Sequence, residues 1–144
     1  MKIISVANRK GGVGKTTTTI NIATALSSIG RNVLVIDFDP QGNATTSMGI
    51  AKQKENYSSY DVLIGNCDVK EAVLHTDLPR FDMIPSSPDL AAAEIELVEV
   101  DKREFVLKKA LNSLEAVYDY VLIDCPPSLN LITINALVSS NSVM

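Results

Sequence analysis

A short segment rich in glycine, lysine and threonine has the residue types that bind phosphate groups. Residues 10–17 read KGGVGKTT and directly follow an apolar run at residues 3–7. Glycines allow the backbone to approach a ligand closely, and a helix that starts here directs its N–H groups and positive dipole end at an anion. Lys15 supplies a positive charge for terminal phosphates, and the Thr16 hydroxyl is an oxygen ligand suited to Mg²⁺. The segment predicts a phosphate-binding loop; a glycine-rich turn with chance lysines is the alternative.

The spacing of this segment differs from the usual P-loop pattern, G-x-x-x-x-G-K-[ST]. The position of the first glycine in that pattern is Arg9 here, and the glycines are Gly11, Gly12 and Gly14. A second lysine, Lys10, precedes them. This is the deviant form of the motif, and it narrows the class of protein that the segment indicates.

Two aspartates come after apolar runs that are expected to be strands, and their carboxylates are candidate groups for metal chemistry. Asp124 ends the apolar run of VLIDCPPSL, which is the position of a Walker B carboxylate that holds Mg²⁺. Asp39 lies in DFDPQGNAT, after another apolar run. In the alternative interpretation, Asp124 only caps the turn before Pro126. Within the second motif we favour Asp39 for the chemistry, and we expect Asp37 to anchor the loop.

The elements that must position these residues alternate between strand and helix. Apolar β-branched runs predict buried strands, and apolar residues three or four apart predict helices. Strands are expected at residues 3–7, 33–36, 81–84 and 120–123, with a further strand beginning at 142–144. Helices are expected at residues 16–29, 60–64, 69–74, 88–97, 107–117 and 131–138. This order predicts a three-layer α/β/α fold of the P-loop type with a mostly parallel sheet, formed by one domain over residues 1–144.

Three of these helices have an apolar face that we expect to be buried. The expected buried positions are Ile22, Ala25, Leu26 and Ile29 in the first helix, Leu90, Ala93, Ile95 and Leu97 in the fourth, and Leu107, Ala110, Leu111, Leu114 and Val117 in the fifth. The acidic run at residues 94–104 is expected to be a solvated helix face, with a partner-binding surface as the alternative. His75, the only histidine, is expected at the surface.

Composition and charge are those of an ordinary globular protein. Of the 144 residues, 46% are apolar and 21% are charged, and the formal net charge is −4. A chain with net negative charge lacks the positive surface that nucleic-acid binding needs.

Cys67 and Cys125 match no metal-ligand spacing and are expected to be buried thiols in a reducing cytosol. No signal peptide or membrane span is evident, so we expect a cytoplasmic location and no membrane contact.

Three motifs taken together resemble one family. KGGVGKTT at residues 10–17, DFDPQGNAT at 37–45 and VLIDCPPSL at 121–129 follow predicted strands, and SSPDLAAAEIEL at 86–97 fits the same pattern. The set resembles the ParA/Soj partition ATPases, within the deviant P-loop ATPases that include MinD and the nitrogenase iron protein. The Pro-Gln-Gly-Asn of the second motif is similar to ParA and Soj rather than to MinD. Orphan ParA-like ATPases that position other cargo are the alternative.

The resemblance implies a site for ATP or ADP with Mg²⁺. The nucleotide-binding residues would be Lys10, Gly11, Gly12, Val13, Gly14, Lys15, Thr16 and Thr17. Thr17 would donate to an α-phosphate oxygen, whereas Thr18 and Thr19 are expected to be helix residues without a phosphate role. Lys10 would reach across a nucleotide-sandwich dimer to the phosphates of the partner.

The resemblance also implies which residues act in hydrolysis. The catalytic residues would be Lys10, Lys15 and Asp39, and the residues that hold the metal would be Thr16, Asp39 and Asp124. Asp39 would orient the attacking water as well as help to hold the metal shell. Positioning of this kind is the main contribution that a protein makes to phosphoryl transfer.

The implied activity is Mg-ATP hydrolysis in chromosome or plasmid partitioning, with ATP-dependent homodimerisation and a ParB-like partner. The chain resembles only the N-terminal part of such proteins, so we expect a C-terminally truncated fold whose adenine pocket and DNA-binding residues lie beyond Met144. Non-specific DNA binding is then expected of the full-length protein and not of this fragment. We expect residues 1–144 alone to aggregate readily and to show no appreciable ATP turnover. A nucleotide-binding remnant without turnover is the alternative.

Overall fold

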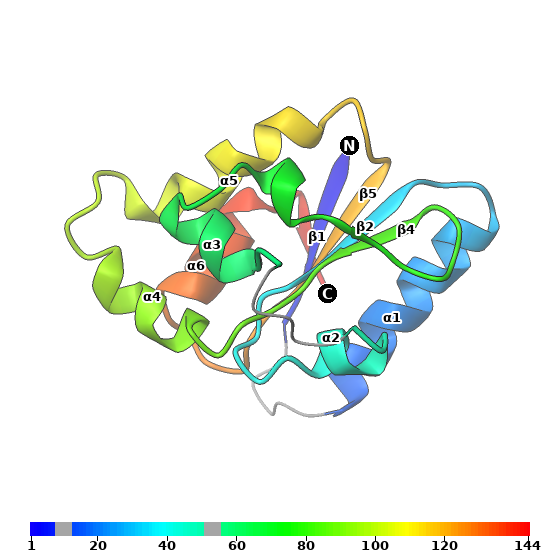
Figure 1. The fold of residues 1–144 in the computed structure, drawn as a ribbon, viewed down its shortest axis with the longest axis horizontal. Coiled ribbons are helices and arrows are strands. Elements are labelled where there is room, and N and C mark those ends of the chain that lie inside the picture. The colour runs from blue at the N-terminus through cyan, green and yellow to red at the C-terminus, as the bar shows by residue number, and fades with distance from the viewer. Residues whose placement is uncertain (8–12, 51–55) are drawn as a thin grey trace.

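The computed structural model describes residues 1–7, 13–50 and 56–144, and a six-stranded sheet lies at its centre (Figure 1). The strand order is β3-β4-β2-β5-β1-β6. Neighbouring strands are parallel except for the edge strand β3, which runs antiparallel to β4. The strands are β1 Lys2–Val6, β2 Val33–Asp37, β3 Leu74–His75, β4 Phe81–Ile84, β5 Tyr120–Asp124 and β6 Ser142–Val143. The prediction of an α/β fold with a mostly parallel sheet is confirmed.

Helices cover both faces of this sheet. They are α1 Val13–Ser28, α2 Asn43–Ser47, α3 Ser59–Ile64, α4 Leu90–Glu96, α5 Val106–Leu111 and α6 Leu131–Ser139, with 3₁₀ segments η1 Val69–Ala72, η2 Arg103–Phe105 and η3 Asn112–Leu114. In Figure 1, α1 and α2 lie on one side of the strands, and α3, α4, α5 and α6 lie on the other. In the parts of the chain that the structure describes, no helix has the length and apolar character needed to cross a bilayer.

Strand β2 shows how one short segment contributes to two cores. All five residues of its sequence VLVID are buried. Leu34 and Ile36 belong to the core beneath α3, α4, α5 and α6, whereas Val33 and Val35 belong to the core beneath α1. Because successive side chains of a strand point to opposite faces, a strand covered on both sides needs apolar residues at every position.

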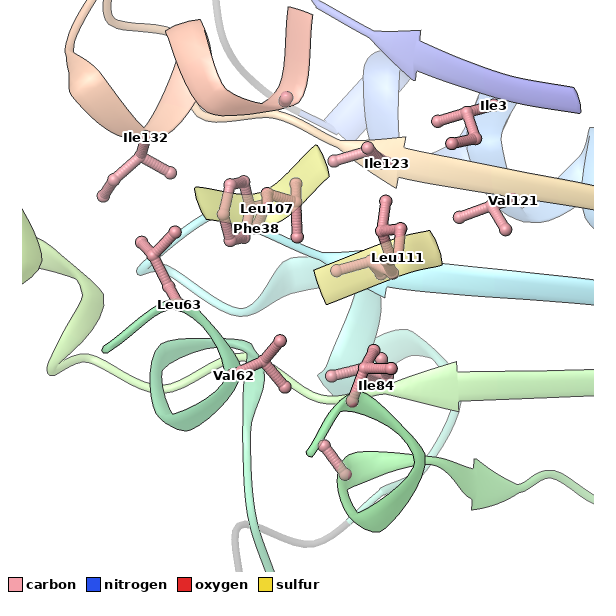
Figure 2. Packing of buried hydrophobic residues seen from close by; sticks show 14 of the residues in the cluster. Ile3, Phe38, Val62, Leu63, Ile84, Leu107, Leu111, Val121, Ile123 and Ile132 are labelled. Atoms are coloured by element: carbon pink, nitrogen blue, oxygen red, sulfur yellow. The ribbon is translucent and has the colours of Figure 1, made fainter. Parts of the chain in front are cut away.

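The larger core packs α5 and α6 against the strands that carry Asp37 and Asp124. Figure 2 shows Ile123 of β5 and Phe38, which follows β2, close to Leu107 of α5 and Ile132 of α6. Phe38 is fully buried directly between Asp37 and Asp39. The apolar side chain therefore anchors a backbone segment whose neighbours are both carboxylates.

Four side chains that were predicted to be buried are exposed instead: Ala25, Ile29 by 72%, Ile95 by 79% and Val117 by 45%. Ile29 follows the end of α1, where the chain turns at Gly30 with a φ of 89°. Ile95 lies off the stripe formed by the buried positions 90, 93 and 97. Val117 lies beyond the observed helix, because α5 ends at Leu111 and the 3₁₀ turn that follows ends at Leu114.

Two predicted local structures also differ. The helix predicted at residues 69–74 is a 3₁₀ turn followed by β3, because Leu74 and His75 pair with β4. The loop expected at residues 39–46 is helical in part, because residues 43–47 form α2 after Gly42. Cys125 is buried as predicted, whereas Cys67 is only partly buried, and both are free thiols.

Candidate nucleotide-binding site

Three predicted site segments meet at one edge of the sheet. Asp37 at the end of β2 and Val6 at the end of β1 are both in register with Asp124 at the end of β5. Open α/β sheets bind ligands outside the carboxyl ends of their parallel strands. Helix α1, which carries Lys15 and Thr16, follows β1 at this same edge.

The centre of the site is a buried ion pair between Lys15 and Asp124. The Lys15 Nζ donates to Asp124 Oδ1 at 2.5 Å and lies 4.0 Å from Asp39 Oδ2. The side chains of Lys15, Asp124 and Asp39 are exposed by 2%, 0% and 7%. A buried charge is tolerated when it is paired and hydrogen-bonded. The lysine predicted to bind phosphate therefore lies between the two carboxylates predicted to act with the metal.

Two threonines of α1 also donate to Asp124. The Thr16 Oγ1 donates to Asp124 Oδ2 at 3.1 Å, so the two predicted metal ligands lie in contact. Thr19 is buried, and its hydroxyl donates both to the carbonyl of Lys15 at 3.0 Å and to Asp124 Oδ1 at 3.4 Å. Thr19 was predicted to be an ordinary helix residue. Its spacing four residues after Lys15 places it on the same helix face, which is the signal that could have identified it.

Asp37 anchors the following loop, as predicted. Its Oδ1 accepts from the Asp39 N–H at 3.2 Å, and its Oδ2 accepts from the N–H and the hydroxyl of Thr45 at 2.8 and 2.6 Å. Burial raises the pKa of Asp37 to about 6, and the negative charge of Asp124 also raises it, whereas the hydrogen bonds from Thr45 lower it. Asp37 therefore binds the loop backbone, while the Asp39 carboxylate is the one that approaches Lys15.

The residues present fit a magnesium ion held partly by phosphate. The Thr16 hydroxyl and the carboxylates of Asp124 and Asp39 are hard oxygen donors, and Mg²⁺ is usually bound by one or two carboxylates together with substrate phosphates. Within residues 1–7, 13–50 and 56–144, no group of three or more His, Cys, Asp or Glu side chains is arranged to hold a metal alone. The oxygen set is therefore of the kind that a metal–nucleotide complex needs.

The remaining predicted site residues fall into two groups. Lys10, Gly11 and Gly12 lie outside the described residues. Val13 and Gly14 begin α1, and Thr17 is exposed on its first turn. Apart from its chain neighbours and its own helix backbone, none of the described residues has an atom within 4 Å of a Cβ added at Gly14.

The fold and the site together define an α/β protein of the P-loop NTPase type. A mostly parallel sheet brings together Lys15 of the first turn of α1, the Thr16 hydroxyl and two carboxylates at the carboxyl ends of its strands. A family model described as an AAA domain matches residues 1–144. The chain belongs to this AAA domain family.

Sequence relatives support the predicted likeness to the ParA/Soj partition proteins, which is confirmed. The sporulation initiation inhibitor protein Soj of Bacillus subtilis is 50% identical over 143 residues, which are 99% of this chain and 56% of that protein. The chromosome partitioning protein ParA of Caulobacter vibrioides is 48% identical in an alignment 145 positions long, which covers 99% of this chain and 54% of that protein. The chain therefore spans about half the length of the curated relatives it matches.

A solved structure extends the likeness to a protein with bound nucleotide. The structure described as cobyrinic acid a,c-diamide synthase from Mycobacterium smegmatis, with bound ATP analogue and magnesium, has a TM-score of 0.94 and 43% identity. The match covers 99% of this chain and 58% of that one. The P-loop NTPase type of fold is thus shown, and in that protein it holds a nucleotide and magnesium.

Proposed function

We propose that the chain is the nucleotide-binding part of a ParA-like ATPase that binds and hydrolyses Mg-ATP in chromosome or plasmid partitioning. The observation that carries the proposal is the buried cluster in which Lys15 lies between Asp124 and Asp39, with Thr16 in contact with Asp124. Identity to Soj and ParA supports the cellular role, and the solved relative with an ATP analogue and magnesium supports the ligands.

The chemistry divides among the residues of the cluster. Lys15 exchanges its contact with Asp124 for the terminal phosphates, where its charge offsets the negative charge that develops on the leaving group. Thr16 and Asp124 hold the metal, which when bound neutralises phosphate charge. Asp39 holds the attacking water in line with the terminal phosphate and supports the metal shell. Gly14 would leave room beside the phosphates, since no described residue outside its own helix turn has an atom within 4 Å of a Cβ placed there.

Assembly and partners follow from the same proposal. ATP binding would bring two chains together, with Lys10 of each reaching the phosphates of the other, and a ParB-like partner would act on the dimer in the cytoplasm. The net charge of −4 does not favour DNA contact by these residues. Non-specific DNA binding is accordingly assigned to a longer form of the protein.

A titration with a fluorescent ATP analogue in the presence of Mg²⁺ tests the proposal. Loss of a charge-assisted contact costs about 1.5–3 kcal/mol, so Lys15→Ala is expected to weaken binding by about 10–100-fold or more. Lys109→Ala, which removes an exposed lysine of α5, is the matched control and should bind as the wild type does. Thermal melts of both variants separate lost binding from lost folding. Unchanged affinity in a folded Lys15→Ala protein would contradict the assignment.

A further inference from the structure

A closed ring of hydrogen bonds surrounds the backbone of Asp39. The Asp39 N–H donates to Asp37 Oδ1 at 3.2 Å, and the Thr45 hydroxyl donates to Asp37 Oδ2 at 2.6 Å. The Ser86 N–H donates to Thr45 Oγ1 at 2.9 Å, and the Ser86 hydroxyl donates to the carbonyl of Asp39 at 2.5 Å. The ring thus starts and ends on the two backbone polar groups of Asp39.

The ring is buried and joins three separate elements. Asp37 and Thr45 are fully buried, and Ser86 and Asp39 are exposed by 6% and 5%. Asp37 ends β2, Thr45 lies in α2, and Ser86 lies between β4 and α4. Among the described residues, every buried side-chain nitrogen or oxygen has a hydrogen-bond partner. Removing one member would leave a buried donor or acceptor unpaired, and the remaining members would have to move.

The ring of hydrogen bonds restricts the position of the Asp39 carboxylate. With both its N–H and its carbonyl held, the backbone of Asp39 has little freedom, and its Oδ2 stays 4.0 Å from Lys15 Nζ. In the described structure, neither Thr45 nor Ser86 has a hydrogen bond with Lys15, Thr16 or Asp124. The ring therefore supports the water-orienting group without being part of the phosphate and metal contacts.

We propose that Thr45 and Ser86 are positioning residues for ATP hydrolysis, which hold the Asp39 carboxylate at the distance and angle that the attacking water requires. The inference rests on the proposed function and adds to it two residues that are not hydrogen-bonded to Lys15, Thr16 or Asp124 in the described structure. Small displacements of a positioning group reduce reaction rates steeply, whereas affinity for the substrate depends on other contacts. Loss of the ring should therefore slow hydrolysis and leave nucleotide binding intact.

The test uses the longest natural form of the protein and compares four variants. Thr45→Val and Ser86→Ala remove the hydroxyls, and Thr45→Ser retains one. Thr46→Val, on the exposed neighbour of Thr45 in α2, is the matched control. Single-turnover hydrolysis at saturating Mg-ATP and equilibrium binding of an ATP analogue are measured for each. Hydrogen exchange at the amides of Asp39 and Gln41 reports on the loop independently of turnover.

Thr45→Val and Ser86→Ala are expected to lower the single-turnover rate by about tenfold or more, while the dissociation constant stays within about twofold. Thr45→Ser and Thr46→Val should stay within about threefold of the wild-type rate. The Asp39 amide should exchange faster in Thr45→Val. Equal loss of rate and affinity, or an unchanged rate, would overturn the inference.

Failure of the proposed function can be distinguished from failure of this inference, because it is measured on the wild-type protein. A wild-type protein that binds the analogue and hydrolyses no ATP would contradict the proposed activity, and with it the role of Thr45 and Ser86 in hydrolysis. Hydrogen exchange then still decides whether the ring holds Asp39. Unchanged protection in Thr45→Val would show that it does not.

Discussion

Two clusters, each centred on a carboxylate, lie toward opposite ends of the strands of the same sheet, and they differ in their exposure to water. Asp124 ends β5 and binds Lys15 where both side chains are almost completely buried. Asp82 is the second residue of β4, and its oxygens lie 2.7 Å from His75 Nδ1 and 2.6 Å from the Tyr118 hydroxyl. There the His75 side chain is 88% exposed. The two clusters have similar hydrogen-bond distances and very different surroundings.

Burial decides what each contact contributes. An exposed pair is screened by water and salt and contributes little, whereas a buried pair that loses one member leaves an uncompensated charge in a region of low dielectric. Around Asp124, hydrogen bonds from Lys15, Thr16 and Thr19 replace the water that the charged groups lose on burial. The comparison therefore identifies the carboxyl edge as the place where a change of partner, such as an arriving phosphate, has large energetic consequences.

The largest effect on stability is expected from Lys15→Met, which keeps much of the side-chain length and removes the charge. Asp124 then stays buried without its cation, so we expect the free energy of unfolding to fall by about 3–5 kcal/mol. Urea denaturation followed by circular dichroism measures it. The double variant Lys15→Met/Asp124→Asn should recover part of the loss, because no net charge is left buried. A loss below about 1 kcal/mol in the single variant would mean that the pair is not desolvated as described.

The sequence was sufficient to predict every strand of the described sheet except β3, together with the residues at the carboxyl ends of β2 and β5. Lys15, Thr16, Asp39 and Asp124 were selected from local motifs, and parallel pairing brings them together. Such motifs combine a glycine-rich turn or an apolar run with the polar residue that ends it, so one short window contains the signal.

The supporting residues could not be predicted in this way. Thr45 and Ser86 are 41 residues apart, and Ser86 and Asp39 are 47 apart, so no local pattern indicates their hydrogen bonds. The two-residue strand β3 is defined by its partner β4 rather than by its own sequence. Ile29 is exposed because α1 ends before it, and Ile95 is exposed because a different face of α4 packs on the core. Tertiary contacts decide both the end of a helix and the face that it buries.

The smallest effect is expected at the exposed cluster. Asp82 raises the pKa of His75 above its ordinary value of 6.5 through a hydrogen bond and its negative charge. The contact with Asp82 therefore stabilises the fold fully below pH 6.5 and loses this contribution as the pH rises through the raised value. Because the imidazole is solvated, His75→Ala should lower the unfolding midpoint only slightly at pH 5.5 and by less at pH 8. Thermal melts at the two pH values check this, and a large loss at pH 8 would show that the two clusters are equivalent.

The most direct test of the account is hydrolysis by Asp39→Ala, since Asp39 is the carboxylate assigned to the chemistry rather than to binding. In the longest natural form of the protein, this variant should bind the ATP analogue as the wild type does, because Lys15, Thr16 and Asp124 remain. Its single-turnover rate should fall by well over tenfold, which is more than about 1.4 kcal/mol in the barrier. A rate within about threefold of the wild type, or about 0.7 kcal/mol, would contradict the role given to Asp39.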